Sequence, residues 1–145
     1  MNRKKTVCYN IKAAWHTISR MYNGFGTEHN VSISMGYVLI NLSTEKSVPS
    51  THIAPLLGME ARSLTRLLKS MEEQKLIKKQ IDILDKRQVN IYLTETGNKK
   101  KAIVAKIIKD FNHILLSKID NSELLIFNKV LEQITNITEH NFKEV

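Results

Sequence analysis

Cationic and hydroxyl side chains recur along one face of a predicted helix in the middle of this 145-residue chain. Segment 60–74 places them opposite a stripe of leucines, at Arg62, Ser63, Thr65, Arg66 and Lys69. A guanidinium can donate two parallel hydrogen bonds to guanine O6 and N7, and hydroxyls can serve bases or phosphates. This pattern is typical of a helix that enters the major groove of DNA. Taken alone, such a stripe has a second interpretation as a solvated helix face.

A predicted hairpin connection carries the second polar group. Segment 82–97 (DILDKRQVNIYLTETG) begins with a charged tip and continues with alternating apolar residues. Lys86 and Arg87 can reach a minor groove, where narrow A·T-rich tracts concentrate negative potential. Asp85 would repel phosphate, so we expect it to hold Arg87 or the turn backbone by hydrogen bonds, as in an Asx turn. A plain surface turn is the alternative.

Helices are predicted on both sides of these two sites. Apolar residues spaced by three and four predict helices over about 6–23, about 33–42, 49–57 and 60–74, then a long helix after Thr94 and a last helix from about 120. Asn23 to Gly26 is predicted to end the first helix, Ser32 or Ser34 to cap the second, and Gly58 to turn the chain between the third and fourth. Two helices joined by so short a turn indicate a helix-turn-helix.

The apolar period changes to two after segment 60–74. One predicted strand carries Ile77, Ile81 and Ile83 on one side, and the next carries Val89, Ile91 and Leu93. Thr94 is expected to cap the following helix, with Gly97 at its third position. The order predicts a mainly α protein with a small two-stranded wing (α+β), which is a winged helix-turn-helix.

Composition limits the classes of function. Lys plus Arg number 22 against 14 for Asp plus Glu, a net charge of +8, which favours a polyanionic partner. No stretch approaches the roughly 18 apolar residues of a spanning helix, so we expect a cytoplasmic protein without membrane contact. Cys8 is the only cysteine, and the histidines are scattered, so neither a disulfide framework, a metal nor a cofactor is expected. No catalytic motif stands out, so an enzyme is not expected.

Three sequence blocks together resemble the MarR family of bacterial transcription regulators. They are residues 57–72 (LGMEARSLTRLLKSME), Asp85 with Arg87, and residues 93–97 (LTETG). The resemblance implies a homodimer held by the first and last helices, which binds a palindromic DNA operator with two recognition helices and two wings. Ser50 and Thr51, on the first helix of the pair, join the candidate DNA contacts. The whole chain, 1–145, is then one winged-helix domain, with about 6–23 and 95–140 for dimerisation and about 33–94 as the DNA-binding lobe.

The stripe of Leu124, Leu131 and Ile134 fits the implied dimer, because it is close to a heptad seam that requires a partner helix. Two positions depart from the family pattern. Lys75 stands where a glycine usually ends the recognition helix, and a left-handed backbone there costs a non-glycine residue about 1 kcal/mol. Pro55 falls inside a predicted helix, so this helix must be short or bent.

Members of this family often act as repressors and are released from DNA by a small-molecule effector or an oxidant. Trp15, His16, Met21 and Tyr37 are candidates to line an effector crevice, although aromatics and Met at helical spacing are more often core. Cys8 is a candidate redox sensor, against the default of a buried structural cysteine. The sequence does not distinguish a repressor from an activator.

Two other functions remain open at this point. The chain can be a winged-helix protein-interaction module whose wing never meets DNA, or a thiol peroxidase acting through Cys8. Salt dependence separates the first from a DNA-binding regulator, because phosphate contacts make affinity fall steeply with salt. Turnover of peroxide that Cys8→Ser abolishes would identify the second.

Overall fold

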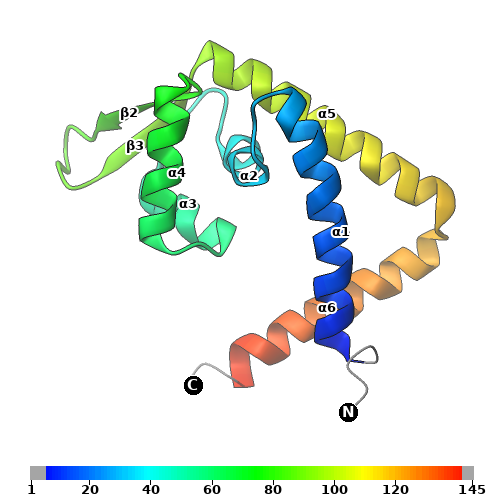
Figure 1. Cartoon of the computed structure of the whole chain (residues 1–145). Helices are drawn as coiled ribbons and strands as arrows, with labels where there is room; N and C mark the ends of the chain where they lie inside the picture. The colour runs from blue at the N-terminus through cyan, green and yellow to red at the C-terminus, as the bar shows by residue number, and fades with distance from the viewer. Residues whose placement is uncertain (1–5, 142–145) are drawn as a thin grey trace. The chain divides into compact units, whose positions relative to one another are not determined.

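The computed structural model describes residues 6–141 and contains six helices and three strands within them. In chain order these are α1 (Val7–Glu28), α2 (Ile33–Asn41), β1 (Val48–Pro49), α3 (Ser50–Leu57), α4 (Ala61–Glu73), β2 (Ile77–Ile81), β3 (Val89–Leu93), α5 (Glu95–Lys118) and α6 (Asn121–Asn141) (Figure 1). The predicted winged helix-turn-helix is confirmed, with α3 and α4 as the helix pair and the β2–β3 hairpin as the wing.

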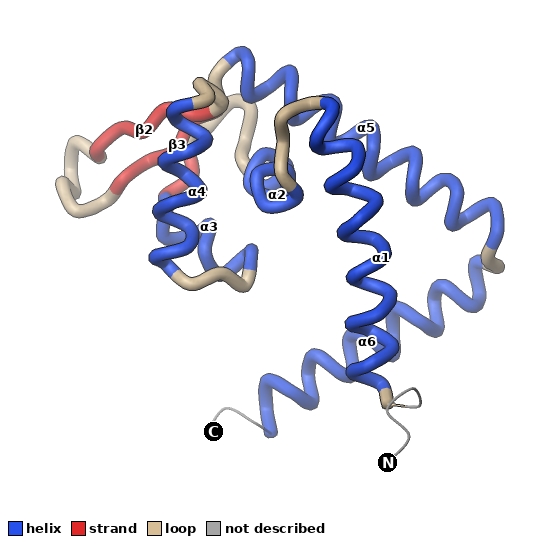
Figure 2. Tube along the Cα trace, viewed as in Figure 1, coloured by secondary structure: helices blue, strands red, loops and turns tan. Residues whose placement is uncertain are grey.

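The sheet has three antiparallel strands in the order β1-β3-β2, where the sequence predicted two (Figure 2). The additional strand, β1, pairs Val48 with Ile91 and Pro49 with Asn90. Two residues are too few to show an alternating pattern, and proline lacks the N–H that a strand interior uses. The sequence therefore carried no strand signal at β1.

The chain divides into two compact units, with the boundary between Ile107 and Ile108 inside α5. The first unit contains α1 to α4, the sheet and the first half of α5. The second contains the rest of α5 and α6. Within residues 6–141, no helix combines the length and apolarity needed to cross a membrane.

One apolar core holds the helix pair and the wing together in the first unit. Its fully buried side chains come from α2, α3, α4 and both long strands, and the largest are Leu39, Leu42, Ile53, Met71, Ile77, Ile91 and Val38. Removing this apolar surface from water is the main force that holds these elements in place. The orientation of α4 and the root of the wing therefore depend on the same packing.

The first helix ends later than the sequence predicts. Its predicted end lay at Asn23 to Gly26, but the helix continues to Glu28. Gly26 lies inside it, where a Cβ would stand 2.1 Å from the carbonyl oxygen of Val31. The glycine thus allows two backbone segments to approach, and Asn30, with φ 53°, ends the helix instead. Val31 N–H closes this turn on the Gly26 carbonyl at 2.9 Å.

Two lysines of α5 fix the ends of the first two helices. Lys100 donates from Nζ to the carbonyl of His29 at 2.6 Å, and Lys101 donates to the carbonyl of Leu42. His29 and Leu42 are the C-terminal caps of α1 and α2, where the helix dipole favours a positive charge. These lysines therefore hold three helices of the first unit together rather than adding to a free basic surface.

Helix α3 is short and contains Pro55 at its sixth position. The helix has eight residues, and Gly58, with the left-handed φ of 57°, ends it. Met59 N–H donates to the Ala54 carbonyl at 3.2 Å across this turn. The predicted tight turn at Gly58 is therefore present.

The C-terminal end of α4 is closed at Lys75, two residues beyond Glu73, by the same hydrogen-bond pattern that closes α1 at Asn30. Lys75 has φ 56°, and Leu76 N–H donates to the Met71 carbonyl at 2.9 Å. Lys75 N–H donates to the Glu72 carbonyl, also at 2.9 Å. This is a Schellman ending with a lysine at the left-handed position that glycine usually takes.

We expect Lys75→Gly to raise the free energy of unfolding by about 1 kcal/mol, because glycine has no Cβ to clash in the left-handed region. Urea unfolding followed by circular dichroism measures the change. The matched control is Lys69→Gly, the same exchange inside α4, which should lower the stability by about 1 kcal/mol. A loss of stability in Lys75→Gly would contradict the prediction.

Candidate nucleic-acid interface

Helix α4 has a buried apolar face and an exposed polar face. Leu64, Leu68 and Met71 are buried in the core. The opposite face exposes all five residues that the sequence singles out, which are Arg62, Ser63, Thr65, Arg66 and Lys69. The core thus fixes the rotation of the helix and presents these side chains to solvent.

The two arginines are free to bind an external group. Arg62 and Arg66 stand one helical turn apart. Neither guanidinium makes a hydrogen bond or ion pair with any residue in 6–141. Lys69 lies 4.0 Å from Glu73, and both are well exposed, so this pair contributes little. Thr65 donates its hydroxyl to the Ala61 carbonyl at 2.9 Å, which leaves it only as an acceptor. Arginine forks are therefore the main donors on this face.

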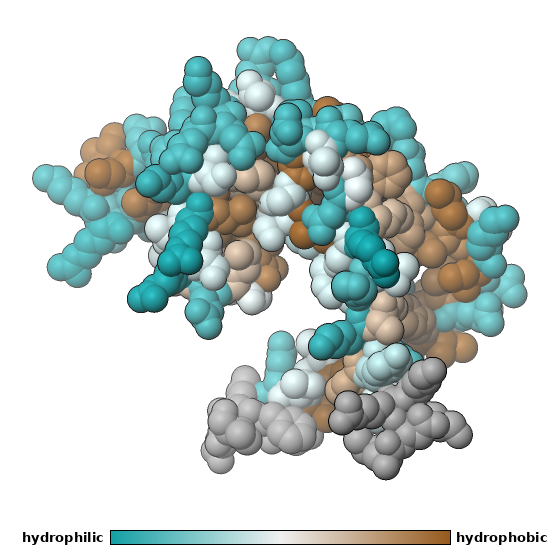
Figure 3. Space-filling view, viewed as in Figure 1, coloured by the Kyte–Doolittle hydropathy of each residue, from teal (hydrophilic) through white to brown (hydrophobic). Residues whose placement is uncertain are grey.

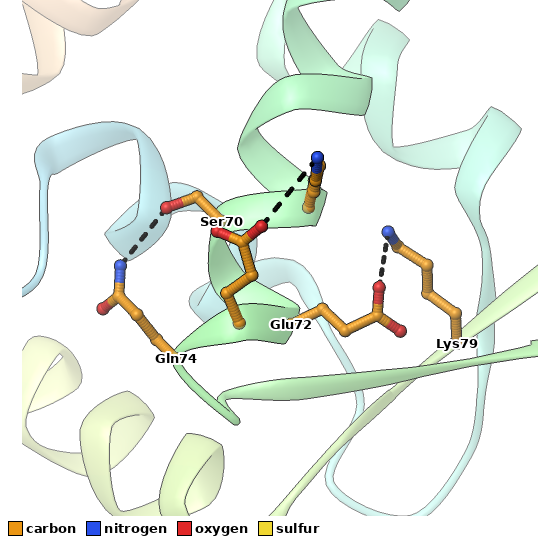
Figure 4. Close-up of polar contacts among 6 residues, drawn as sticks. Ser70, Glu72, Gln74 and Lys79 are labelled. Atoms are coloured by element: carbon orange, nitrogen blue, oxygen red, sulfur yellow. Dashed lines mark hydrogen bonds and ion pairs between the residues drawn. The ribbon is translucent and has the colours of Figure 1, made fainter.

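The C-terminal half of α4 makes one ion pair with the sheet and one side-chain hydrogen bond with its own C-cap. Glu72 pairs with Lys79 of β2 at 2.9 Å, and Gln74 donates to the hydroxyl of Ser70 at 3.3 Å (Figure 4). The link from Glu72 to Lys79 holds α4 against the root of the wing. Ser50 and Thr51 occupy the first two positions of α3, where Ser50 is half-buried and Thr51 is exposed.

Asp82 organises the wing tip, and the sequence reading missed it. Its Oδ1 accepts from the N–H groups of Leu84 (2.9 Å) and Asp85 (3.0 Å), and its Oδ2 accepts from Nδ2 of Asn90 (2.8 Å). These hydrogen bonds lower the pKa of the Asp82 carboxyl. The backbone N–H of Asp85 contributes most, followed by that of Leu84 and by the side chain of Asn90. An aspartate at the start of a hairpin connection, before the N–H groups of the next residues, was the available signal.

These bonds also explain why β2 ends at Ile81. The sequence placed Ile83 on the strand, but it lies in the connection, and Ile81 is exposed rather than on an inner face. Asp82 N–H still donates to the Gln88 carbonyl at 2.9 Å. Beyond that bond the chain turns, because its next N–H groups bind the Asp82 carboxylate instead of a neighbouring strand.

Asp85 makes a hydrogen bond of the type that the sequence suggests. Its Oδ1 accepts from the N–H of Arg87 at 3.0 Å, and its carbonyl accepts from the N–H of Gln88 at 2.9 Å. The side chains of Lys86 and Arg87 are exposed and bind no other residue of the described chain. Whether Asp85 positions the wing for DNA stays a prediction.

We expect Asp82→Ala to speed hydrogen exchange at the amides of Leu84 and Asp85, because both lose their acceptor. Asp82→Asn is the matched control, since its Oδ1 can still accept from these two N–H groups.

The pKa of Asp82 in the folded protein lies below the ordinary 3.8. The carboxylate therefore stabilises the tip above that pH and loses this effect as the pH falls through the folded-state pKa. NMR-detected exchange measures both variants, and equal rates in Asp82→Ala and the wild type would rule out this role.

The candidate effector residues are only partly brought together. Trp15 and Tyr37 are in contact, with ring centroids 6.2 Å apart. Met21 and His16 lie on α1 with Trp15, where Met21 is half-buried and His16 is exposed. Burial raises the pKa of Tyr37. Burial is also the larger cause of the raised pKa of Tyr22, and the charge of Tyr37 is the smaller one.

Two further expectations concern cysteine and metal. Cys8 is exposed on the first turn of α1, so the default of a buried structural cysteine is wrong. Among residues 6–141, no group of three His, Cys, Asp or Glu side chains could hold a metal ion.

Comparison with known proteins gives a consistent result. The family model described as transcriptional regulator SarA/Rot matches residues 20–104. The regulator TtmR of Methylorubrum extorquens (strain PA1) is 31% identical over 91 residues, which is 63% of this chain but 47% of TtmR. The chain thus spans about half the length of that relative. SarZ of Staphylococcus aureus is 22% identical over 139 residues, covering 95% of this chain and 90% of SarZ.

A solved structure shares the fold. The S. aureus MepR–DNA complex matches with a TM-score of 0.84 and 22% identity, covering 90% of this chain and 96% of MepR. This likeness shows that the two chains share the winged helix-turn-helix fold that the resemblance implied. Both TtmR and SarZ are described as HTH-type transcriptional regulators.

Proposed function

The chain belongs to the SarA/Rot family of transcriptional regulators, and on that premise we propose that it is a homodimeric repressor that binds a palindromic operator. One observation carries the proposal. Two arginines of α4 and two cations of the wing, whose side chains have no partner within residues 6–141, stand on elements that share a single core. A rigid body therefore carries donors suited to bases and a second cationic site beside them.

In this proposal α4 lies in a major groove and the wing follows the adjacent minor groove. Arg62 and Arg66 contact base edges, with Ser63 and Thr65 beside them, and Lys69 contacts phosphate. Lys86 and Arg87 enter the minor groove, and Ser50 and Thr51 contact the backbone. S. aureus MepR, which shares the fold, is known in complex with DNA, which supports this assignment.

The dimer is supported by apolar side chains that the single chain leaves uncovered. On α1 these are Val7, Tyr9, Ile11 and Trp15, and on α6 they are Leu125, Ile126, Phe127, Val130 and Ile137. Exposed apolar surface of this extent usually marks an interaction site. We assign α1, α5 and α6 to dimerisation and residues 33–94 to the DNA-binding lobe. The recognition helices of such a dimer stand about 34–36 Å apart, or a multiple of this.

We further propose that a small aromatic or anionic effector releases the operator by binding beside Trp15 and Tyr37. The hydroxyl of Tyr37 suits an anionic group, because a phenol is protonated at neutral pH and can donate a hydrogen bond. Trp15 is the only tryptophan, so its fluorescence reports on this place without interference. Salicylate is a suitable first probe: quenching in the wild type that Tyr37→Ala removes supports the site, and unchanged emission counts against it. Oxidation at Cys8 is the other candidate signal, and Cys8→Ser tests it.

Selection of bound duplexes from a random pool tests the main proposal, with sedimentation to measure the oligomeric state. A recovered palindrome and a dimer are the expected results. Affinity should fall steeply with salt, because each neutralised phosphate releases counterions. A monomer, or a protein that ignores all duplexes at low salt, would overturn the proposal and favour a protein-interaction module.

A further inference from the structure

The wing ends in two consecutive large apolar side chains that the fold leaves in water. Ile83 is 86% exposed and Leu84 is 96% exposed, and neither belongs to the core. Figure 3 shows hydrophobic atoms at the far end of the hairpin, among hydrophilic ones. Full burial of one such side chain is worth about 1.5–3 kcal/mol, which this chain does not gain by itself. Ile83 and Leu84 are called the wing-tip pair below.

The backbone that carries the wing-tip pair is held in place. Asp82 accepts from the N–H of Leu84 at 2.9 Å and from that of Asp85 at 3.0 Å. Asp85 in turn accepts from the N–H of Arg87 at 3.0 Å. A loop fixed in this way loses little conformational entropy when it binds, so the pair is prepared for a partner.

The charges around the pair indicate what that partner is. Lys86 and Arg87 follow it after Asp85, and their side chains make no bond to any other residue of 6–141. The carboxylates of Asp82 and Asp85 are turned to N–H groups of their own loop. A matching surface is therefore anionic at its edges and apolar at its centre. The DNA minor groove offers this combination where a base step opens, because phosphates line both rims and the unstacked base faces are apolar.

We propose that the wing-tip pair is an apolar wedge that enters the minor groove beside Lys86 and Arg87, unstacks one base step and bends the duplex. Leucine and isoleucine are among the side chains that other minor-groove proteins insert between bases. Pyrimidine–purine steps such as TA unstack most easily, so the wedge selects such a step at the outer part of each half-site. The inference rests on the proposed function, because it requires DNA binding.

The test uses duplexes that contain the selected operator, with 2-aminopurine at successive positions under the wing and a dye pair at the ends. With the wild type we expect increased 2-aminopurine emission at one step and a shorter distance between the ends. The double variant Ile83→Ala, Leu84→Ala should lose both signals and bind about tenfold more weakly. Its salt dependence should not change, because the phosphate contacts remain.

Three further variants make the result specific. Leu56→Ala removes a side chain on α3 that is 61% exposed, outside the wing, and should leave binding and bending unchanged. Leu84→Met keeps an apolar tip and should keep the emission change. Leu84→Lys adds a cation and should lose the emission change. Matching urea unfolding curves show that each variant is folded.

The outcomes separate the wedge from the proposed function. If the wild type binds no duplex at low salt, the proposed function fails and the wedge fails with it. If it binds with steep salt dependence but the double alanine variant gives the same emission and bend, only the wedge is overturned. The wedge is also overturned if that variant binds and bends DNA normally but loses affinity for purified RNA polymerase, since the tip is then a protein contact.

Discussion

Replacing Gly97 with alanine is expected to lower the free energy of unfolding by about 3 kcal/mol. Gly97 is in the first turn of α5, and a Cβ there would stand 2.0 Å from the carbonyl oxygen of Leu76 and 3.0 Å from its carbon. Backbone cannot yield as the end of a flexible side chain can. The two segments must therefore separate, or the start of α5 must distort.

The surroundings of Gly97 allow little of either movement. Thr94 caps α5 as predicted, because its Oγ1 accepts from Gly97 N–H at 2.9 Å. The same hydroxyl donates to the Lys75 carbonyl at 2.6 Å, and Thr94 N–H donates to the Leu76 carbonyl at 3.1 Å. One residue thus joins the start of α5 to the junction of α4 and β2. An added methyl group strains this junction, which also sets the root of the wing.

Gly24→Ala is the matched control for this prediction. Gly24 lies inside α1, and nothing stands within 4 Å of the place its Cβ would take. Alanine is favoured over glycine in a helix by about 1 kcal/mol, so this variant should be more stable than the wild type. Urea unfolding measures both variants. A Gly97→Ala protein as stable as Gly24→Ala would show that the close approach to Leu76 does not constrain the fold.

The winged helix-turn-helix could be predicted from the sequence because its signals are local and repeated. The leucines of α4 recur every three or four residues, and all the predicted donors lie opposite them. The cap at Thr94 also follows from a residue type at a fixed offset, whereas the left-handed backbone at Lys75 was implied only by the resemblance to the MarR family. Each of these features depends on neighbours within one or two turns of the chain.

The features that were missed depend on residues far apart in the sequence. The sequence predicts a helix end at Gly26. Only the path of the chain through Val31 shows that this glycine lets α1 approach the Val31 backbone closely. Lys100 and Lys101 bind carbonyls 71 and 59 residues away, which no local pattern in the sequence indicates. Asp82 differs from these, because its carboxylate binds the nearby N–H groups of Leu84 and Asp85, and only its bond to Asn90 comes from the next strand.

Arg66→Ala is expected to weaken binding to the selected operator by about 1–3 kcal/mol and to relax the preference at one base pair. The guanidinium of Arg66 makes no bond within residues 6–141, so its removal leaves no partner unpaired and the loss belongs to the DNA contact. Arg66→Lys is the matched variant. It keeps the charge but not the planar fork, so it should bind random DNA normally while losing discrimination.

Lys69→Ala is expected to differ from Arg66→Ala in kind, because an ammonium facing phosphate reads no base. It should weaken operator and random DNA alike and reduce the slope of log affinity against log salt by about 1. Lys46→Ala, which removes an exposed lysine between α2 and β1, controls for net charge. Fluorescence anisotropy on both duplexes at several salt concentrations measures all the variants. If Arg66→Ala and Lys69→Ala lost equal affinity on both duplexes, α4 would act as a cationic surface and not as a helix that recognises sequence.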